Sequence, residues 1–279
     1  MDNYITHIKA KTKWYDIDFK ELYHYRDLIY LFFKRNYATR YKQTILGPLW
    51  LIFNPLITVT LYAIVFGNLA GLSTDGAPQF VFYLCSNSIW TFFATCIIET
   101  ANTFTANAAI MGKVYFPRLV MPISSVVTAM IDFAIQIVML VVIMIGYMLL
   151  GTDFDISANI LIAPLLVLQT GMLGLGCGII VAALTTKYRD LVVLVSFGVQ
   201  LWMYASPVVY SVSIISEKYR AIYLLNPMAA IITCWRNVII GNGNIPVESW
   251  FISWIITLVV LFLGVVLFSR IEKTFMDTV

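Results

Sequence analysis

Long apolar stretches dominate the chain, and short polar segments separate them. A helix that crosses the hydrocarbon core of a bilayer needs roughly 20 mostly apolar residues. Six stretches are long enough, and they lie at about residues 45–67, 79–104, 119–150, 158–184, 191–212 and 250–269. The pattern predicts an all-α, polytopic membrane protein with six transmembrane helices, of which the third is long enough to tilt or to extend beyond the bilayer.

An amphipathic segment at residues 18–36 precedes the first of these stretches. Its apolar and polar positions fall on opposite sides of a helix, as is typical of a helix that lies in the membrane interface. The apolar arc holds Leu22, Tyr25, Ile29, Phe32 and Phe33, and the polar side holds Lys20, His24, Asp27 and Lys34. A continued helix would bring Arg40 onto the apolar arc, so we expect the helix to end or bend near Asn36. One interpretation is a helix that merely anchors the N-terminus.

The basic residues set the orientation of the predicted helices. If the N-terminus is cytoplasmic, 15 of the 18 Lys and Arg residues lie on the cytoplasmic side, in residues 1–44, 105–118, 185–190 and 270–279. Basic residues favour the cytoplasmic side of a membrane protein. We therefore expect both termini in the cytoplasm, with residues 1–44 as a cytoplasmic segment and residues 45–279 as the transmembrane domain.

The predicted outer segment at 213–249 is too long and too apolar for an ordinary connection. It contains a proline at position 227 and ends in the glycine-rich run GNGN. These features predict a pair of short re-entrant helices that dip back toward the membrane and cap a pathway. A helix that lies flat on the outer surface fits the sequence equally well.

Composition excludes most kinds of chemistry. Hydrophobic residues make up 60% of the chain and charged residues 12%, with a mean hydropathy of +0.84. Both histidines, His7 and His24, precede the first apolar stretch, so we expect no metal site and no catalytic cluster within the membrane. The sequence also lacks G-x-x-x-x-G-K-[ST], the loop that cradles nucleotide phosphates. We expect the chain to bind no cofactor itself.

Two acidic residues, Glu99 and Asp132, lie within the second and third apolar stretches. An ionisable residue inside a membrane is a functional candidate by default. Structural pairing with a basic residue is one explanation of both. The other is that they are coupling groups of an ion-coupled transporter or channel, although the sequence has no visible inverted repeat of the kind such transporters often carry.

Aromatic residues make up 15% of the chain, and many fall inside the apolar stretches. Aromatic faces can stack on the apolar faces of sugar rings, which would suit a path for a carbohydrate chain. The candidates are Trp50, Phe53, Tyr62, Phe66, Tyr83, Trp90, Trp202 and Tyr204. Ordinary helix packing explains any single one of them as well. In the fourth stretch, Gly174 and Gly178 form a G-x-x-x-G motif, which predicts a close helix contact.

Two short cytoplasmic segments carry charges that suit a soluble partner. Residues 107–122 combine a helical start, a basic and aromatic run and two prolines, which predicts a protruding turn. Residues 186–190 form a compact charged turn.

Four motifs in this order give the chain a resemblance to a known family. They are RYKQTILGPLW at 40–50, KVYFPR at 113–118, KYRD at 187–190, and NPMAAII at 226–232, which leads to Trp235 and Arg236. Over nearly its whole length the chain resembles the membrane permeases of ABC exporters that move O-antigens, capsular polysaccharides or teichoic acids.

The resemblance implies a homodimer in the bacterial cytoplasmic (inner) membrane, bound to two copies of a separate ATPase that holds ATP and Mg. The substrate would be a lipid-linked glycan or polyol-phosphate polymer, and no nucleic acid is implied. The helix at 18–36 would be the entrance gate, with Arg35, Arg40 and Lys42 at the substrate phosphate. Residues Lys113, Tyr115, Phe116, Arg118, Lys187, Arg189 and Asp190 would couple to the ATPase, and Asn226, Pro227 and Arg236 would belong to the outer gate.

Overall fold

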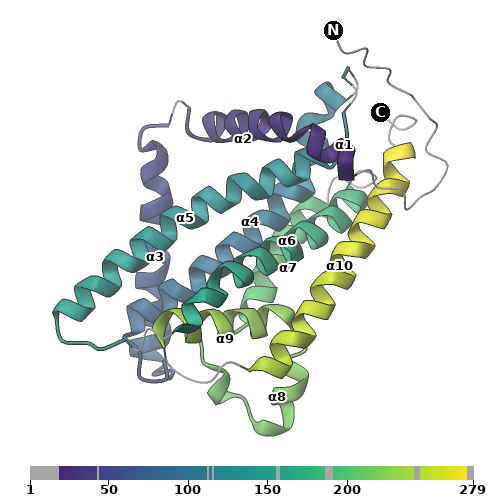
Figure 1. Cartoon of the computed structure of the whole chain (residues 1–279). Coiled ribbons are helices and arrows are strands. Elements are labelled where there is room, and N and C mark those ends of the chain that lie inside the picture. The colour runs from purple at the N-terminus through teal and green to yellow at the C-terminus, as the bar shows by residue number, and fades with distance from the viewer. Residues whose placement is uncertain are drawn as a thin grey trace.

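The protein is a bundle of helices that are long enough to cross a membrane (Figure 1). The structure, a computed structural model, describes residues 19–42, 44–111, 113–114, 116–154, 158–185, 191–241 and 246–274. All regular elements within these ranges are helical, which confirms the predicted all-α class.

Five helical units in the described ranges are long and apolar enough to span a bilayer. They are η1–α3–η2 (Gly47–Leu49, Trp50–Tyr62 and Ala63–Leu69), α4 (Gln79–Met111), α5 (Val120–Leu149), η3–α6 (Ala158–Ile162 and Ala163–Thr185) and α10 (Val247–Thr274). They correspond to the first four predicted stretches and the sixth.

The fifth predicted stretch, 191–212, forms a shorter helix than expected. Helix α7 (Leu191–Tyr204) has 14 residues and ends eight residues before the predicted boundary. Pro207 lacks a backbone N–H and cannot continue a helix. The backbone oxygen of Ala205 instead accepts a hydrogen bond of 3.1 Å from the side chain of Asn226.

Glycines let helix α6 pack closely on two neighbours. A Cβ atom on Gly174 would lie 2.6 Å from Cβ of Cys96, and one on Gly178 would lie 2.5 Å from Cβ of Thr100. These contacts, both with α4, confirm the predicted G-x-x-x-G face. A Cβ atom on Gly176 would lie 2.8 Å from the Leu261 Cα atom of α10. Helix α6 is therefore held tightly between α4 and α10.

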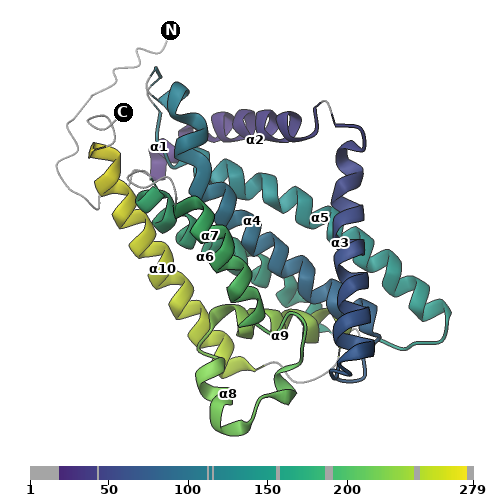
Figure 2. The ribbon, with the colours of Figure 1, turned by 180° about the vertical axis from the view of Figure 1, so that it is seen from behind.

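Helices α1 (Phe19–His24) and α2 (Arg26–Tyr41) precede the first spanning unit, and α2 lies across one end of the bundle (Figures 1 and 2). The predicted apolar arc is buried or half-buried, and the predicted polar side is exposed, so the amphipathic prediction is confirmed. Phe32 packs among residues of α5, α6 and α10.

Of the two alternatives predicted near Asn36, an end of the helix is wrong, because α2 continues to Tyr41. Arg40 does fall on the side that faces the bundle, as the sequence indicated. There Arg40 pairs with two carboxylates, so its charge can be accommodated and the helix can continue.

Two short helices, α8 (Glu217–Tyr223) and α9 (Pro227–Ile240), lie at the opposite end of the bundle from α2 (Figure 1). The side chain of Asn226 caps α9 by accepting a hydrogen bond from the Met228 backbone N–H at 3.1 Å. At its other end Gly241 adopts a left-handed conformation with φ of 85°, which only glycine adopts readily. Most of α9 is buried, and it packs on α4, α6 and α10.

Candidate functional site

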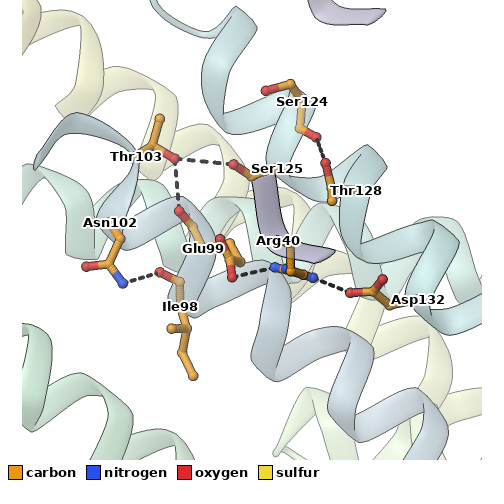
Figure 3. Close-up of polar contacts among 9 residues, drawn as sticks. All are labelled: Arg40, Ile98, Glu99, Asn102, Thr103, Ser124, Ser125, Thr128 and Asp132. Carbon is orange, nitrogen blue, oxygen red and sulfur yellow. Dashed lines mark hydrogen bonds and ion pairs between the residues drawn. The ribbon is translucent and has the colours of Figure 1, made fainter. Parts of the chain in front are cut away.

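A cluster of three charged residues joins α2 to the bundle (Figure 3). Arg40 at the end of α2 donates one hydrogen bond to Glu99 of α4, with an N–O distance of 2.6 Å, and another to Asp132 of α5. The side chains of Arg40, Glu99 and Asp132 are 29%, 45% and 11% exposed. One guanidinium thus lies between two carboxylates, one half-exposed and one nearly buried.

The ion pairs confirm that Glu99 and Asp132 are structurally paired. Their partner is Arg40, which the sequence reasoning assigned to a substrate phosphate. The position of Arg40 on the apolar arc was the signal that pointed to a partner inside the bundle. A single formal negative charge remains on the cluster if all three groups are ionised.

Two adjoining hollows open beside this cluster. The first, here called the Arg40 hollow, has a volume of about 260 Å³ and is lined by Arg40, Thr44, Gly47, Trp50, Leu51 and Asn54. The second, the central hollow, has a volume of about 340 Å³ and lies among α3, α4, α5 and α7. Trp50, Leu51 and Asn54 line both, so the two hollows adjoin each other.

The central hollow is lined by polar side chains as well as apolar ones, although it lies among membrane-spanning helices. Asp132 is its charged lining residue. The uncharged polar residues that line it are Asn54, Thr58, Asn87, Thr91, Thr95 and Gln136. Sequence reasoning missed these residues, because amides and hydroxyls within an apolar stretch do not reveal which side of the helix faces a cavity.

Two of the predicted aromatic residues line the central hollow, and the others do not. Trp50 and Trp90 line the central hollow, and they come from α3 and α4. Tyr83 is fully buried, and its ring centroid lies 6.3 Å from that of Tyr62. The ring of Trp202 lies 6.5 Å from that of Trp90.

Of the remaining aromatic candidates, Phe66 packs edge-on against Tyr62, whereas Phe53 and Tyr204 are exposed. Helix packing therefore accounts for Tyr62, Phe66, Tyr83 and Trp202.

The loop between α4 and α5 touches α2 directly. The ring centroids of Phe116 and Phe32 are 5.6 Å apart, and the Arg35 guanidinium lies over the Phe32 ring at 4.7 Å. Arg35 also donates a hydrogen bond of 2.6 Å to the side-chain oxygen of Asn107 near the end of α4. Partial burial lowers the pKa of Arg35 from its usual value.

The other coupling candidates are only partly within the described ranges. Lys113 is exposed and Arg118 is half-buried. Tyr115, Lys187, Arg189 and Asp190 lie outside the described residues. Lys42, predicted to bind phosphate, is exposed at the end of α2.

At the opposite end of the bundle, Arg236 of α9 holds the chain that follows α7. It donates hydrogen bonds of 2.9 Å to the Pro207 backbone oxygen and 3.2 Å to that of Tyr210. Its guanidinium lies over the Phe82 ring of α4 at 4.4 Å from the centroid. Asn226 accepts a hydrogen bond of 3.0 Å from the Trp202 indole. These contacts tie α9 to α4 and α7.

A third hollow, of about 390 Å³, opens beside Arg236 between α9 and the segment that contains Asp75. Asp75 accepts hydrogen bonds from Ser211 and Ser213, the second at 2.9 Å. Within the described ranges, no group of three or more His, Cys, Asp or Glu residues could hold a metal ion.

Comparisons with known proteins give a consistent result. Residues 27–240 match the family described as ABC-2 type transporter. The chain is 29% identical over 252 residues to an O-antigen export system permease protein RfbA of Klebsiella pneumoniae, covering 90% of this chain and 94% of that protein. It is 27% identical over 263 residues to the RfbA permease of Myxococcus xanthus, covering 93% and 98% of the two chains.

Proposed function

Because the chain belongs to the ABC-2 type transporter family, we propose that it is the membrane permease subunit of an ATP-driven polysaccharide exporter. The observation that carries this proposal is the similarity to O-antigen export permeases over at least nine-tenths of the chain. An O-antigen is accordingly the favoured cargo over a capsular polysaccharide or a teichoic acid. The chain is a multi-pass protein of the bacterial inner membrane.

We place both ends of the chain in the cytoplasm and count α7 as the sixth crossing. The start of α1 and the end of α10 lie at the same end of the bundle (Figure 1). An odd number of crossings would separate them, so a sixth is needed beside the five long units. With its 14 residues, α7 is shorter than an ordinary span, and the segment that follows it would complete the passage.

The energy for export would come from a separate ATPase that holds ATP and Mg. Its docking site would be the loop around Lys113 and Arg118, in a complex of two permeases and two ATPases. The contacts of Phe116 with Phe32 and of Arg35 with Asn107 provide a physical link from this loop to α2. A movement of the loop would therefore shift α2 without a further intermediary.

Helix α2 would act as an entrance gate for a lipid-linked polymer. Lys42 is exposed and can meet a lipid phosphate directly. Arg40 is held by two carboxylates, so it could bind phosphate only if it exchanged partners. Arg35 bonds to amide oxygens and serves mainly to hold α2 against α4.

The competing hypothesis, an ion-coupled transporter, would use Glu99 and Asp132 as coupling groups. Both carboxylates pair with Arg40, which favours a structural role for them.

The outer end would be closed by α8 and α9 as a re-entrant gate. Burial of α9 against α4, α6 and α10 supports a position within the bundle rather than flat on its surface. Pro227 starts α9, and Asn226 and Arg236 fix it to the end of α7.

Purification with the neighbouring gene products tests this proposal. The chain should be recovered in a complex with a protein that carries a nucleotide phosphate-binding loop. Recovery of the chain without any ATPase, from cells that express both genes, would contradict the proposed function.

A further inference from the structure

Two buried amide side chains line the central hollow and have no hydrogen-bond partner among the residues that the structure describes. Asn87 of α4 is 6% exposed and Gln136 of α5 is 4% exposed. Neither side chain has a hydrogen bond to any residue that the structure describes, and the Oε1 atom of Gln136 is inaccessible to solvent. Both residues line the hollow.

Unpaired amides are costly in this setting. A buried polar group without a hydrogen bond destabilises a protein, and lipid around the bundle offers no replacement partner. Another glutamine in the bundle has its hydrogen bonds satisfied. Gln169 of α6 donates to Ser253 at 2.7 Å and accepts from the Trp250 indole at 2.8 Å. Unlike Gln169, Asn87 and Gln136 have no hydrogen bond within the described residues, so their amides are available to a ligand that enters the hollow.

The other lining groups define what could enter. Thr58, Thr91 and Thr95 add hydroxyls that can donate and accept, and Trp50 and Trp90 add aromatic faces. An amide likewise both donates and accepts, without charge. Asp132, the charged lining residue, is paired with Arg40. The uncharged groups suit a neutral, polyhydroxylated ligand with apolar ring faces, which describes a sugar. The hollow's volume of about 340 Å³ lies within the range of small-molecule sites.

The position of Arg40 makes the two ends of this space chemically different. Its hollow adjoins the central one through Trp50, Leu51 and Asn54. The charged cluster of Arg40, Glu99 and Asp132 therefore lies nearer the α2 end, and the neutral amides lie further along the spanning helices. A lipid-linked glycan would meet the charged residues and the hydroxyl-binding residues at separate places along this path, whichever end of it enters first.

We propose that Asn87 and Gln136 form a hydrogen-bonding subsite for the sugar hydroxyls of the exported polymer inside the central hollow. The proposal rests on the proposed export function. It assigns recognition of the sugars to two amides in addition to the aromatic residues. Binding at such a subsite is weak, because each neutral hydrogen bond contributes little after desolvation.

Leucine replacements separate this role from a structural one. Asn87→Leu and Gln136→Leu remove polar groups that have no partner, so the permease should stay as stable as the wild type or become more stable. Gln169→Leu is the matched control, since it leaves Ser253 and Trp250 without their partner and should lower the stability. Each variant is purified with its ATPase and placed in vesicles with the lipid-linked polymer of the host.

In the complete complex, Asn87→Leu and Gln136→Leu should each lower export by about threefold to tenfold. The polymer concentration that half-stimulates ATP hydrolysis should rise by a similar factor, while basal hydrolysis stays unchanged. Gln136→Asn, which keeps an amide, should recover part of the loss.

Two results would overturn the subsite. Unchanged export in both leucine variants would mean that the amides merely face water, and lowered stability in proportion to lost export would mean that they bond within the assembled complex. If the wild-type complex itself moves no polymer, the proposed export function is refuted, and the sugar subsite that rests on it is refuted as well.

Discussion

Removal of the Arg40 guanidinium tests whether the charge cluster holds α2 to the bundle. Arg40→Met keeps an unbranched side chain of moderate length but leaves Glu99 and Asp132 without their shared cation. Asp132 is the more consequential of the two, because its side chain is only 11% exposed, whereas that of Glu99 is 45% exposed. Loss of the Arg40 cation beside a carboxylate as buried as that of Asp132 should destabilise the permease.

The magnitude follows from the burial of each partner. Breaking a fully buried ion pair costs about 3–5 kcal/mol, and an exposed pair contributes about 0–1 kcal/mol. The 29% exposure of Arg40 places its bond with Asp132 between these limits, so Arg40→Met should lower the free energy of unfolding by about 2–3 kcal/mol. Asp132→Asn leaves Arg40 paired with Glu99 and should cost about 1–2 kcal/mol. Glu99→Gln should cost about 0.5 kcal/mol.

Unfolding of the purified permease in mixed micelles, followed as the denaturing detergent is increased, measures these free energies. The double variant Arg40→Met/Asp132→Asn completes a double-mutant cycle with the two single variants. We expect a coupling energy of about 1.5–2 kcal/mol between Arg40 and Asp132. A coupling energy under about 0.5 kcal/mol would refute the reasoning, because the two groups would then not stabilise each other.

Three further predictions follow from the orientation, the loop and the close helix contact. A cysteine placed at Ser73 should react with a membrane-impermeant thiol reagent from outside the cell, and one at Lys113 should react only after the membrane is opened. Lys113→Glu and Arg118→Glu should lower recovery of the ATPase with the permease while membrane insertion is unchanged; full recovery of the ATPase would remove this loop from the interface. Gly176→Ala should cost about 1–3 kcal/mol of unfolding free energy, because the added Cβ meets backbone atoms of α10, whereas Gly198→Ala, with open space around it, should cost nothing measurable.

Much of the fold could be predicted from the sequence because membrane-spanning helices are recognised by the length of their apolar stretches. The first four stretches and the sixth became helical units at nearly the expected residues. The arc from Leu22 to Phe33 was predicted correctly, since burial on one side of a helix repeats with its turn. Gly174 and Gly178 were also read correctly, as their spacing places both on one side of α6.

The errors arose where contacts between distant segments decide the outcome. Arg40 bonds to residues 59 and 92 positions away, and only those partners explain why α2 passes Asn36. Just after the end of α7, the backbone oxygen of Ala205 accepts a hydrogen bond from Asn226, 21 positions further along the chain.

The same limit applies to the candidate site. Nothing in the sequence singles out Asn87 and Gln136, because which neighbour each side chain faces depends on the rotation of α4 and α5 about their axes. Only the packed bundle places both amides beside Trp50 and Trp90. The aromatic residues fall into two groups for the same reason: Tyr83 is packed inside the bundle, whereas Trp90 lines the hollow.

The central claim is that this permease exports a polysaccharide with energy from a separate ATPase. The direct measurement uses the complex of both proteins in sealed vesicles loaded from outside with the host's lipid-linked O-antigen. In vesicles whose ATPase sites face outward, export moves the glycan into the vesicle. After ATP is added, the glycan should therefore disappear from the outer surface, as measured with a lectin or antibody that cannot cross the membrane. A complex that hydrolyses ATP but leaves the glycan fully accessible on the outer surface would contradict the account.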